Sequence, residues 1–283
     1  MIAYQQLTTH GDEVLKSFMT GCDGEFKPMS YFLMNGLPKE PVVIWGILRG
    51  SSLILQACMD QGHEYYYGDN CYLGDKRDYF RITKNNLQTT ELNDYPDDRL
   101  REFDITVKDW TRSGSHILIC PPTQGFRIFF NIHEWTEQTI QTLRKHTDRP
   151  IIVREKPAEM AILDSAGYLT PDVHGTTLLK RSRKIKNRVP LSEDLKDCWA
   201  VVTHQSNVAG DAVMNGVPAF VSEHSAAFTL GNTKLSNIEK PHYSDDVEKW
   251  FRHLSYNQFN LDEMKSGFAW EIFCVTKSEQ GIA

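Results

Sequence analysis

The stretch Trp199-Ala-Val-Val-Thr-His-Gln-Ser-Asn-Val-Ala-Gly-Asp-Ala-Val-Met-Asn-Gly-Val-Pro-Ala-Phe-Val-Ser222 decides the fold. Its first four residues are apolar and predict a short buried strand. Apolar residues then recur at helical spacing, which predicts a helix over about 207–215. Gly216 suits the left-handed conformation that ends a helix, and Pro218 prevents its continuation. A second buried strand is expected at 219–221, so the stretch forms a strand–helix–strand unit of a parallel sheet.

The polar corner between the first strand and the helix is the expected binding site. The first turn of a helix leaves backbone N–H groups unpaired, and the positive end of the helix dipole favours a phosphate or diphosphate. Asp211 lies one turn into the helix, where its carboxylate can accept hydrogen bonds from sugar hydroxyls. A simple helix cap with a solvated Asp211 is the alternative interpretation. The corner itself supplies the polar side chains Thr203, His204, Gln205, Ser206 and Asn207.

The pattern S-N-x-x-x-D-A-x-x-x-G-x-P resembles the nucleotide-binding element in the C-terminal domain of GT-B glycosyltransferases. In that family a Ser/Thr-rich corner holds the donor diphosphate, and an acidic residue, usually Glu, contacts the ribose. Here the acid is Asp211, which is one methylene shorter. Three further segments, 190–195, 225–231 and 254–270, resemble small glycosyltransferase-like proteins of phages, some of which attach sugars to hydroxymethylated pyrimidines in DNA.

This resemblance implies an α/β, GT-B-like fold, in which two Rossmann-like domains with parallel sheets face a cleft. It also implies a nucleotide-sugar co-substrate, expected to be a UDP-sugar, with no permanently bound cofactor and no metal ion. The implied acceptor is double-stranded DNA.

Length and composition are those of an ordinary soluble protein. The 283 residues provide enough chain for two domains. The net charge of −6 gives no general attraction to nucleic acid, so DNA would have to bind a local patch. The six cysteines are scattered without a C-x-x-C pair, which indicates reduced thiols in a cytoplasmic protein, in the host cytoplasm if phage-encoded. We find no signal peptide and no apolar run long enough to cross a membrane.

The first domain is expected over residues 1–110, with strands at 1–5, 41–45 and 63–67 and helices at 13–20 and 51–61. Open α/β sheets bind ligands at the carboxyl ends of their strands. Several side chains follow these strands. Asp69 is our choice for a general base on the acceptor hydroxyl, with Asp75, Asp12 and His10 as competing candidates. Arg49 lies between two glycines and is expected to bind a phosphate. A capping role for His10 and a solvated Arg49 are the alternatives.

The second domain is expected over 111–283 after a linker at 109–114, and its final helices are left free to pack on the first domain. Strands are predicted at 116–120 and 150–153. Thr123 follows the first of them, and Glu223 follows strand 219–221, near the expected donor sugar. Arg154 and Lys156 follow strand 150–153 and resemble the cationic corner of GT-B enzymes. Two fixed cations there would stabilise a departing nucleoside diphosphate.

Two basic segments favour a nucleic-acid acceptor. In the first, Arg77 and Arg81 alternate with aromatic residues in a predicted loop over 72–84, a combination that suits base stacking and phosphate contact. The second carries six cations and no acid, and such a run binds phosphates without sequence preference. Packed tyrosines and solvated surface charge are the alternatives. A base read inside a duplex must first be extruded. The cations of the second segment are Lys180, Arg181, Arg183, Lys184, Lys186 and Arg188.

Several other classes lack their motifs in this sequence, which has no G-x-x-x-x-G-K-[ST], no G-x-G-x-x-G, no strand ending in D-x-D, no G-x-S-x-G and no H-E-x-x-H. The favoured function is sugar transfer from a nucleotide-sugar to a hydroxymethylated pyrimidine in DNA. One alternative is a transferase or epimerase that acts on a polysaccharide or nucleotide-sugar. Another is a nucleotide- or DNA-binding protein without enzymatic activity. The sequence leaves the oligomeric state open.

Overall fold

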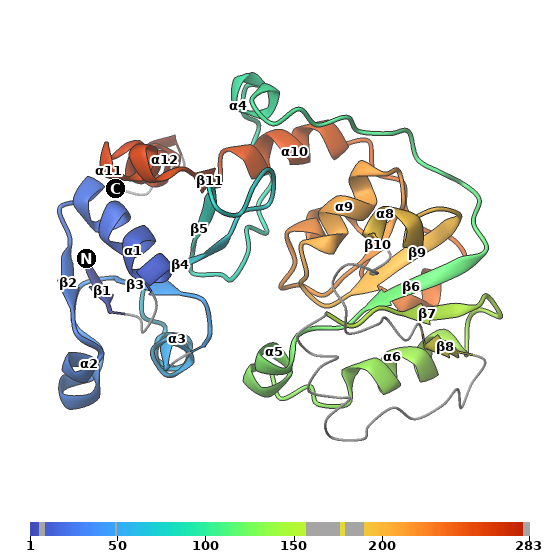
Figure 1. Cartoon of the computed structure of the whole chain (residues 1–283), viewed down its shortest axis with the longest axis horizontal. Coiled ribbons are helices and arrows are strands. Elements are labelled where there is room, and N and C mark those ends of the chain that lie inside the picture. The colour runs from blue at the N-terminus through green and yellow to red at the C-terminus, as the bar shows by residue number, and fades with distance from the viewer. Residues whose placement is uncertain (6–8, 49, 157–175, 179–189, 280–283) are drawn as a thin grey trace. The chain divides into compact units, whose positions relative to one another are not determined.

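The computed structural model describes residues 1–5, 9–48, 50–156, 176–178 and 190–279, with only the backbone described for Thr9, 176–178 and 275–279. The chain divides into two compact units. Unit 1 comprises residues 1–104 and 249–283, and unit 2 comprises residues 105–248. Each unit is built around one sheet with helices packed on it (Figure 1). The segment 249–283 was expected in the second domain, with its helices free to pack on the first, and it belongs to unit 1.

Unit 1 is a mixed sheet in the order β11-β5-β4-β3-β1-β2. Strands β1 to β4 are parallel, whereas β5 and β11 are antiparallel additions at one edge. Its elements are β1 (Ile2–Tyr4), α1 (Thr9–Gly21), β2 (Glu25–Lys27), α2 (Met29–Asn35), β3 (Val42–Trp45), α3 (Ser51–Gln61), β4 (Tyr65–Asn70), β5 (Phe80–Lys84), α4 (Asp98–Arg101), α10 (Val247–Ser255), β11 (Gln258–Phe259), α11 (Leu261–Lys265) and α12 (Phe268–Glu279).

Two predictions for unit 1 are wrong. The segment 72–84, expected to be a loop, contains β5, so this sheet is not wholly parallel. The apolar spacing of residues 261–273 also predicts one closing helix there, and the structure instead forms the two helices α11 and α12. Gly267 adopts a φ of 91° at the break, and α1 crosses so closely there that a Cβ on Gly21 would lie 1.9 Å from the Met264 carbonyl oxygen. Glycine is therefore required at both positions.

Unit 2 is a five-stranded parallel sheet in the order β10-β9-β6-β7-β8. Its strands β6 and β9 consist almost wholly of apolar residues, as expected for strands covered on both faces. Its elements are β6 (His116–Cys120), α5 (Gln124–Phe129), α6 (Trp135–Leu143), β7 (Ile151–Val153), β8 (Thr176–Leu178), α8 (Leu191–Asp194), β9 (Cys198–Thr203), α9 (Val208–Met214), β10 (Ala219–Phe220) and the 3₁₀ turns η2 (Ala226–Leu230) and η3 (Leu235–Asn237).

The expected linker at 109–114 is held against unit 2. The Thr111 N–H and hydroxyl both donate to the Gly216 carbonyl, and the Trp110 indole N–H donates to the Ser244 carbonyl at 2.9 Å. Gly216 has a φ of 74°, and a Cβ there would lie 2.1 Å from the Asp109 carbonyl oxygen. The glycine after α9 therefore serves two purposes, since it ends the helix and admits the incoming chain.

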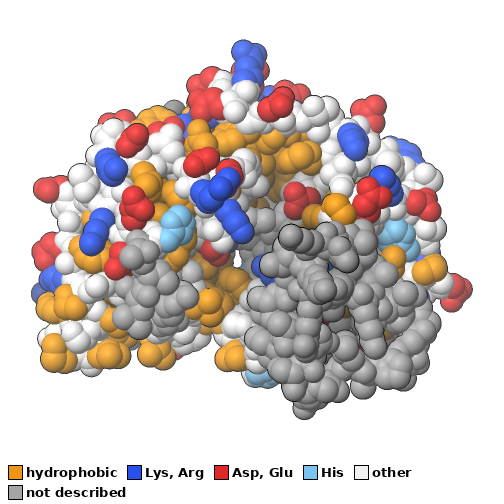
Figure 2. Space-filling view, viewed as in Figure 1, with side chains coloured by type: hydrophobic (Ala, Val, Ile, Leu, Met, Phe, Trp, Pro, Cys, Tyr) orange, Lys and Arg blue, Asp and Glu red, His pale blue; other side chains and the backbone are white. Residues whose placement is uncertain are grey.

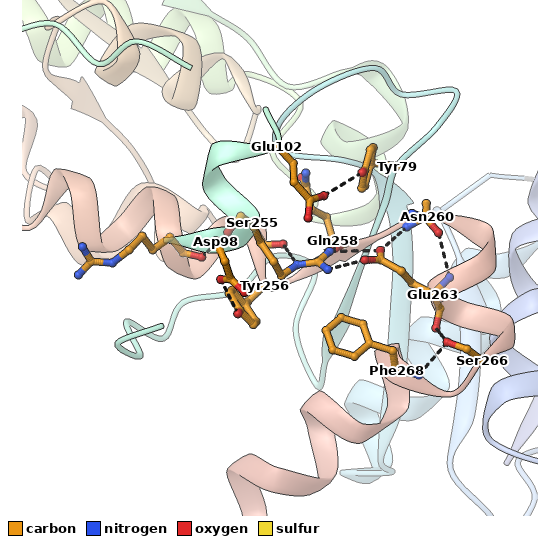
Figure 3. Close-up of polar contacts among 12 residues, drawn as sticks. Tyr79, Asp98, Glu102, Ser255, Tyr256, Gln258, Asn260, Glu263, Ser266 and Phe268 are labelled. Carbon is orange, nitrogen blue, oxygen red and sulfur yellow. Dashed lines mark hydrogen bonds and ion pairs between the residues drawn. The ribbon is translucent and has the colours of Figure 1, made fainter. Parts of the chain in front are cut away.

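A buried arginine fastens the C-terminal segment to unit 1. The Arg99 guanidinium forms an ion pair with Glu263 and donates to the carbonyls of Ser255 at 3.0 Å and Gln258 at 2.8 Å (Figure 3). It also lies 5.2 Å from the centre of the Phe268 ring. One side chain of α4 thus joins the three elements β11, α11 and α12 to the rest of the unit.

We expect Arg99→Ala to lower the free energy of unfolding of unit 1 by about 3–5 kcal/mol, because the half-buried Glu263 carboxylate and the buried carbonyls of Ser255 and Gln258 all lose this donor. Equilibrium urea unfolding measures this loss. Arg101→Ala is the matched control from the same helix. Arg101 pairs with Asp97 in solvent, and exposed pairs of this kind contribute about 1 kcal/mol or less. Equal losses in the two variants would contradict the fastening role.

Unit 1 also contains a buried neutral histidine. Burial lowers the pKa of His253 from its usual 6.5 to about 4. Its Nδ1 accepts the Asn93 N–H at 3.1 Å, so the ring proton lies on Nε2, 2.6 Å from the Thr89 hydroxyl oxygen. Charging this ring in the folded protein would put a proton on Nδ1 and disrupt its contact with the Asn93 N–H.

The folded state therefore binds fewer protons than the unfolded state between pH 6.5 and pH 4. The contribution of His253 to stability is fully present above pH 6.5 and falls by about 1.4 kcal/mol per pH unit as the pH drops through this window. Urea unfolding of the protein and of His253→Asn at pH 7.5, 6, 5 and 4.5 measures the effect. The variant is expected to have a lower free energy of unfolding at pH 7.5 and to lose less of it per pH unit. Parallel dependences of the two proteins on pH would contradict the assignment.

Candidate functional site

The sheet of unit 2 changes its direction of winding at β6. The chain runs from β6 outward to β7 and β8, then returns to the other side of β6 to form β9 and β10. The loops after β6 and β9 therefore diverge at the carboxyl edge of the sheet and leave a crevice. Open α/β sheets bind ligands at such a switch point.

A pocket of about 480 Å³ occupies this place. Its walls come from the residues after β6, β7 and β9, and from the start of α8. The structure brings together here five of the residues that the sequence analysis assigned to donor binding. The pocket is lined by Cys120, Pro121, Arg154, Glu155, Lys156, Pro190, Leu191, Ser206, Asn207, Val208 and Asp211.

Two ion pairs fix the corner that follows β7. Arg154 pairs with Asp194, and both side chains are almost fully buried. Glu155 accepts two hydrogen bonds from Arg127, at 3.0 and 2.9 Å. Lys156 is exposed at the pocket wall. The corner therefore combines one cation that is held by an acid with one that faces solvent.

The opposite wall carries hydroxyl, amide and carboxyl groups. Ser206 and Asn207 precede α9, and the Ser206 hydroxyl accepts the Val208 N–H at 3.4 Å. Asp211 keeps an exposed surface on the pocket side of α9, while the surrounding protein desolvates its carboxyl and raises its pKa. The pocket thus places cations on one wall and hydrogen-bonding groups on the other, as a phosphorylated polar ligand would require.

The other residues of the polar corner lie outside this pocket lining. Thr203 is buried, and its hydroxyl donates to the Cys120 carbonyl at 2.7 Å, so it joins β9 to β6. His204 is buried, and its Nδ1 lies 2.6 Å from the Gln205 amide oxygen. These three side chains support the corner from within.

Thr123 and Glu223, also predicted to bind the donor, lie outside the pocket lining. Thr123 is the N-cap of α5, and its hydroxyl accepts the Phe126 N–H. Glu223 is exposed beside His224, whose ring stacks on Phe130 at 4.5 Å. Neither residue lines the pocket, although both lie at the carboxyl edge of the sheet.

In unit 1 the structure gives Asp69 a partner. Asp69 lies inside β4, and β5 places Arg81 directly opposite it. The carboxylate accepts from Arg81 at 3.0 Å, from the Tyr67 hydroxyl at 3.1 Å and from the Asn70 N–H at 2.8 Å. A substrate hydroxyl would have to displace one of these donors, which makes Asp69 a poor choice for a general base.

His10 is better placed for contact with a substrate. It lies in the first turn of α1 with an exposed side chain, and its ring packs edge-on against Trp45 and Phe80. Apolar side chains gather over α2 and α3 on the same unit (Figure 2). The exposed ones include Leu33 within α2, Leu48 after β3 and Leu53 in the first turn of α3. Arg49, the third candidate, lies outside the described residues.

The prediction that Arg81 contacts DNA is wrong, because the residue is only 4% exposed and paired with Asp69. Phe80 is fully buried in the core of unit 1 and offers no surface for base stacking. Arg77 is exposed but pairs with Asp75 through two hydrogen bonds of 3.0 and 3.1 Å from its Nε. The other predicted DNA contacts, Lys180, Arg181, Arg183, Lys184, Lys186 and Arg188, lie outside the described residues.

Asp194, Pro121 and Leu191 are not among the predicted site residues, although Leu191 and Asp194 lie in the segment 190–195 that shares the family resemblance. Asp194 belongs to a polar, acidic turn that looks solvated in sequence, and only the fold shows that it meets Arg154. Pro121 and Leu191 carry no chemical signal of their own. Their positions, directly after β6 and at the start of α8, are the only indication that they line a site.

No family model matches this sequence, and no curated protein matches it. Solved structures do. KpsC of Thermosulfurimonas dismutans, described as a beta Kdo 2,4 transferase, is 11% identical, covers 92% of each chain and has a TM-score of 0.52. The same organism's KpsC beta Kdo 2,7 transferase is 10% identical over 95% of this chain and 98% of that one, with a TM-score of 0.47.

A putative UDP-N-acetylglucosamine 2-epimerase from Listeria monocytogenes is 12% identical over 100% of this chain and 96% of its own, with a TM-score of 0.28. The first of the three likenesses confirms an α/β, GT-B-like fold, and at this identity it establishes the fold alone. Among the helices that the structure describes, none is long and apolar enough to span a bilayer.

The different surroundings of Thr203 and Ser206 lead to a prediction about stability. Thr203→Val is expected to lower the free energy of unfolding of unit 2 by about 1–3 kcal/mol, because it leaves a buried carbonyl without its donor. Ser206→Ala, at the half-buried pocket wall, is expected to change it by less than about 0.5 kcal/mol. Thermal and urea unfolding of both variants measure the difference. Equal effects would contradict the supporting role of Thr203.

Proposed function

We propose that this protein transfers a sugar from a nucleotide-sugar to an acceptor hydroxyl, and that the pocket of unit 2 holds the nucleotide. The observation that carries the proposal is the composition of the pocket at the switch point. There the loops after β6, β7 and β9 gather Arg154, Lys156, Ser206, Asn207 and Asp211 into one cavity. Cations and hydroxyl donors suit phosphate groups, and a carboxylate suits the ribose hydroxyls.

In this reaction the acceptor oxygen forms a bond to the anomeric carbon, and the bond from that carbon to the donor phosphate breaks. The nucleotide leaves with the bonding electron pair, so its phosphate gains negative charge. Arg154, which Asp194 holds, and the exposed Lys156 would direct N–H donors at this charge, which lowers the barrier without a metal ion. The pocket is compatible with a UDP-sugar, which is the donor that the family resemblance implies.

The proton of the acceptor hydroxyl needs a base, and we propose His10 for this role in place of Asp69. Its imidazole is exposed in the first turn of α1, whereas the Asp69 oxygens are occupied by three donors of unit 1. Imidazole is the side chain most often used for proton transfer near neutral pH.

A hydroxymethylated pyrimidine in DNA stays the first acceptor that we propose to test. Its support comes from the sequence alone, through the phage resemblance and the basic run at 179–188. The burial of Arg81 removes one of its arguments. Transfer to a saccharide acceptor is the alternative, and the KpsC likeness places an activated Kdo among the donors to try.

The test is a product assay with purified protein. Each UDP-sugar, and a nucleotide-activated Kdo, is incubated with duplex DNA containing 5-hydroxymethylcytosine or 5-hydroxymethyluracil, or with oligosaccharides, and products are identified by mass. A sugar-sized increment on one acceptor is the expected result. Nucleotide binding without any transfer would favour the non-enzymatic alternative, and the absence of both would refute the proposal.

Lys156→Ala is expected to lower kcat/KM by about 10- to 100-fold, because it removes a charge-assisted contact to the leaving phosphate. Lys156 is exposed, so the fold should be unaffected. Lys196→Ala is the matched control, since Lys196 is also an exposed lysine of unit 2 and pairs with Glu193 outside the pocket lining. Normal turnover in Lys156→Ala would remove this residue from the donor site.

A further inference from the structure

We propose that Asp194 is a positioning residue of the donor pocket, which holds the Arg154 guanidinium in the wall where it meets the phosphate of the nucleotide. This inference rests on the proposed function and assigns a residue to it that lies behind the pocket surface. Asp194 itself does not line the pocket, whereas Arg154 does. The acid would therefore act through the arginine and not on the ligand.

The geometry around Arg154 supports this assignment. Its backbone is fixed at the end of β7, where its N–H donates to the Ile119 carbonyl at 2.8 Å. Its side chain is 9% exposed and that of Asp194 is 6% exposed, with Nη1 of the arginine against Oδ2 of the acid. A contact this well shielded from water is screened far less than a surface pair, and it limits the guanidinium to a few orientations.

Asp194 is in turn anchored to the sheet. It is the last residue of α8, the short helix whose first turn supplies Leu191 and, at its N-cap, Pro190 to the pocket wall. The carbonyl of Asp194 lies 3.0 Å from Nε2 of His116, a buried residue at the start of β6. The chain of contacts therefore runs from the central strand through Asp194 to Arg154 and reaches the pocket.

This arrangement has a chemical consequence. An arginine carries five N–H donors in a rigid fork, so an acid on one part of the fork leaves others for a phosphate. The acid also offsets much of the charge of Arg154, so this guanidinium would contribute mainly directed hydrogen bonds to the phosphate. Fixing donors before the ligand arrives avoids the entropy cost of ordering them during binding.

A double-mutant cycle tests the inference. The dissociation constant for UDP, or for the nucleoside mono- or diphosphate that the wild-type protein binds most tightly, is measured by calorimetry. The four proteins are wild type, Asp194→Ala, Arg154→Ala and the double variant. Asp194→Ala is expected to weaken binding about 10-fold or more in the wild-type background. In the Arg154→Ala background it is expected to change binding by less than about 2-fold, because two residues that act as one unit are not additive.

The design includes variants that keep the fold. The double variant removes both charges of the buried pair and leaves neither uncompensated. Asp194→Asn keeps the volume and one acceptor oxygen, and is expected to retain more affinity than Asp194→Ala. Glu239→Gln is the control, because it removes the acid of another ion pair of unit 2, the more exposed pair with Arg149 at 3.0 Å, outside the pocket lining. It should leave the dissociation constant unchanged.

The outcomes separate the two proposals. If the wild-type protein binds no nucleotide, the proposed function fails and this inference fails with it. If the wild type binds and Asp194→Ala binds equally well, the inference alone is overturned. Equal losses from Asp194→Ala in both backgrounds would also overturn it, because the acid would then act independently of Arg154.

Discussion

The parallel pairing of β6 between β7 and β9 is the constraint on which the candidate site depends. Parallel strands end at the same edge of a sheet, so the residues that follow these three strands meet although they lie far apart in sequence. The reversal of winding at β6 then makes the loops diverge and opens the pocket. Arg154 and Ser206 are neighbours for this reason alone. The order of the strands thus places the site, and the side chains on the loops decide what it binds.

The elements of this arrangement were predicted well where the hydrophobic periodicity agrees with the positions of the glycines and prolines that end helices and strands. The helix expected at 51–61 has those bounds, with left-handed glycines before and after it. The strands at 116–120 and 150–153 and the unit around Ser206 also have their expected form. Because apolar runs and chain breakers act locally, they can be read from one sequence. The likeness to a solved GT-B-like structure then confirmed the architecture.

Partners of buried charges could not be predicted in the same way. Arg81 and Asp69 looked like two functional groups, yet the antiparallel register of β4 and β5 places them opposite each other as a cross-strand pair. Nothing in the sequence indicates a partner for Asp194, which is nearly buried against Arg154. A sequence shows that a charge exists but not what compensates it, since the compensating residue is chosen by long-range pairing. Long-range pairing also brings β11 to the sheet of unit 1, whereas the predicted domains 1–110 and 111–283 only left the final helices free to pack there.

The return of residues 249–283 to unit 1 has a consequence for biosynthesis. The first 104 residues leave the ribosome without β11, α11 and α12, and thus without Phe259, Met264 and Phe273, which complete their core. Unit 2 is continuous in sequence and is the first part of the chain that can become fully folded during translation. Until the last segment arrives, the edge of β5 stays open to other strands in the cell. Chaperone contact during synthesis would therefore be concentrated on the N-terminal segment, although it is made first.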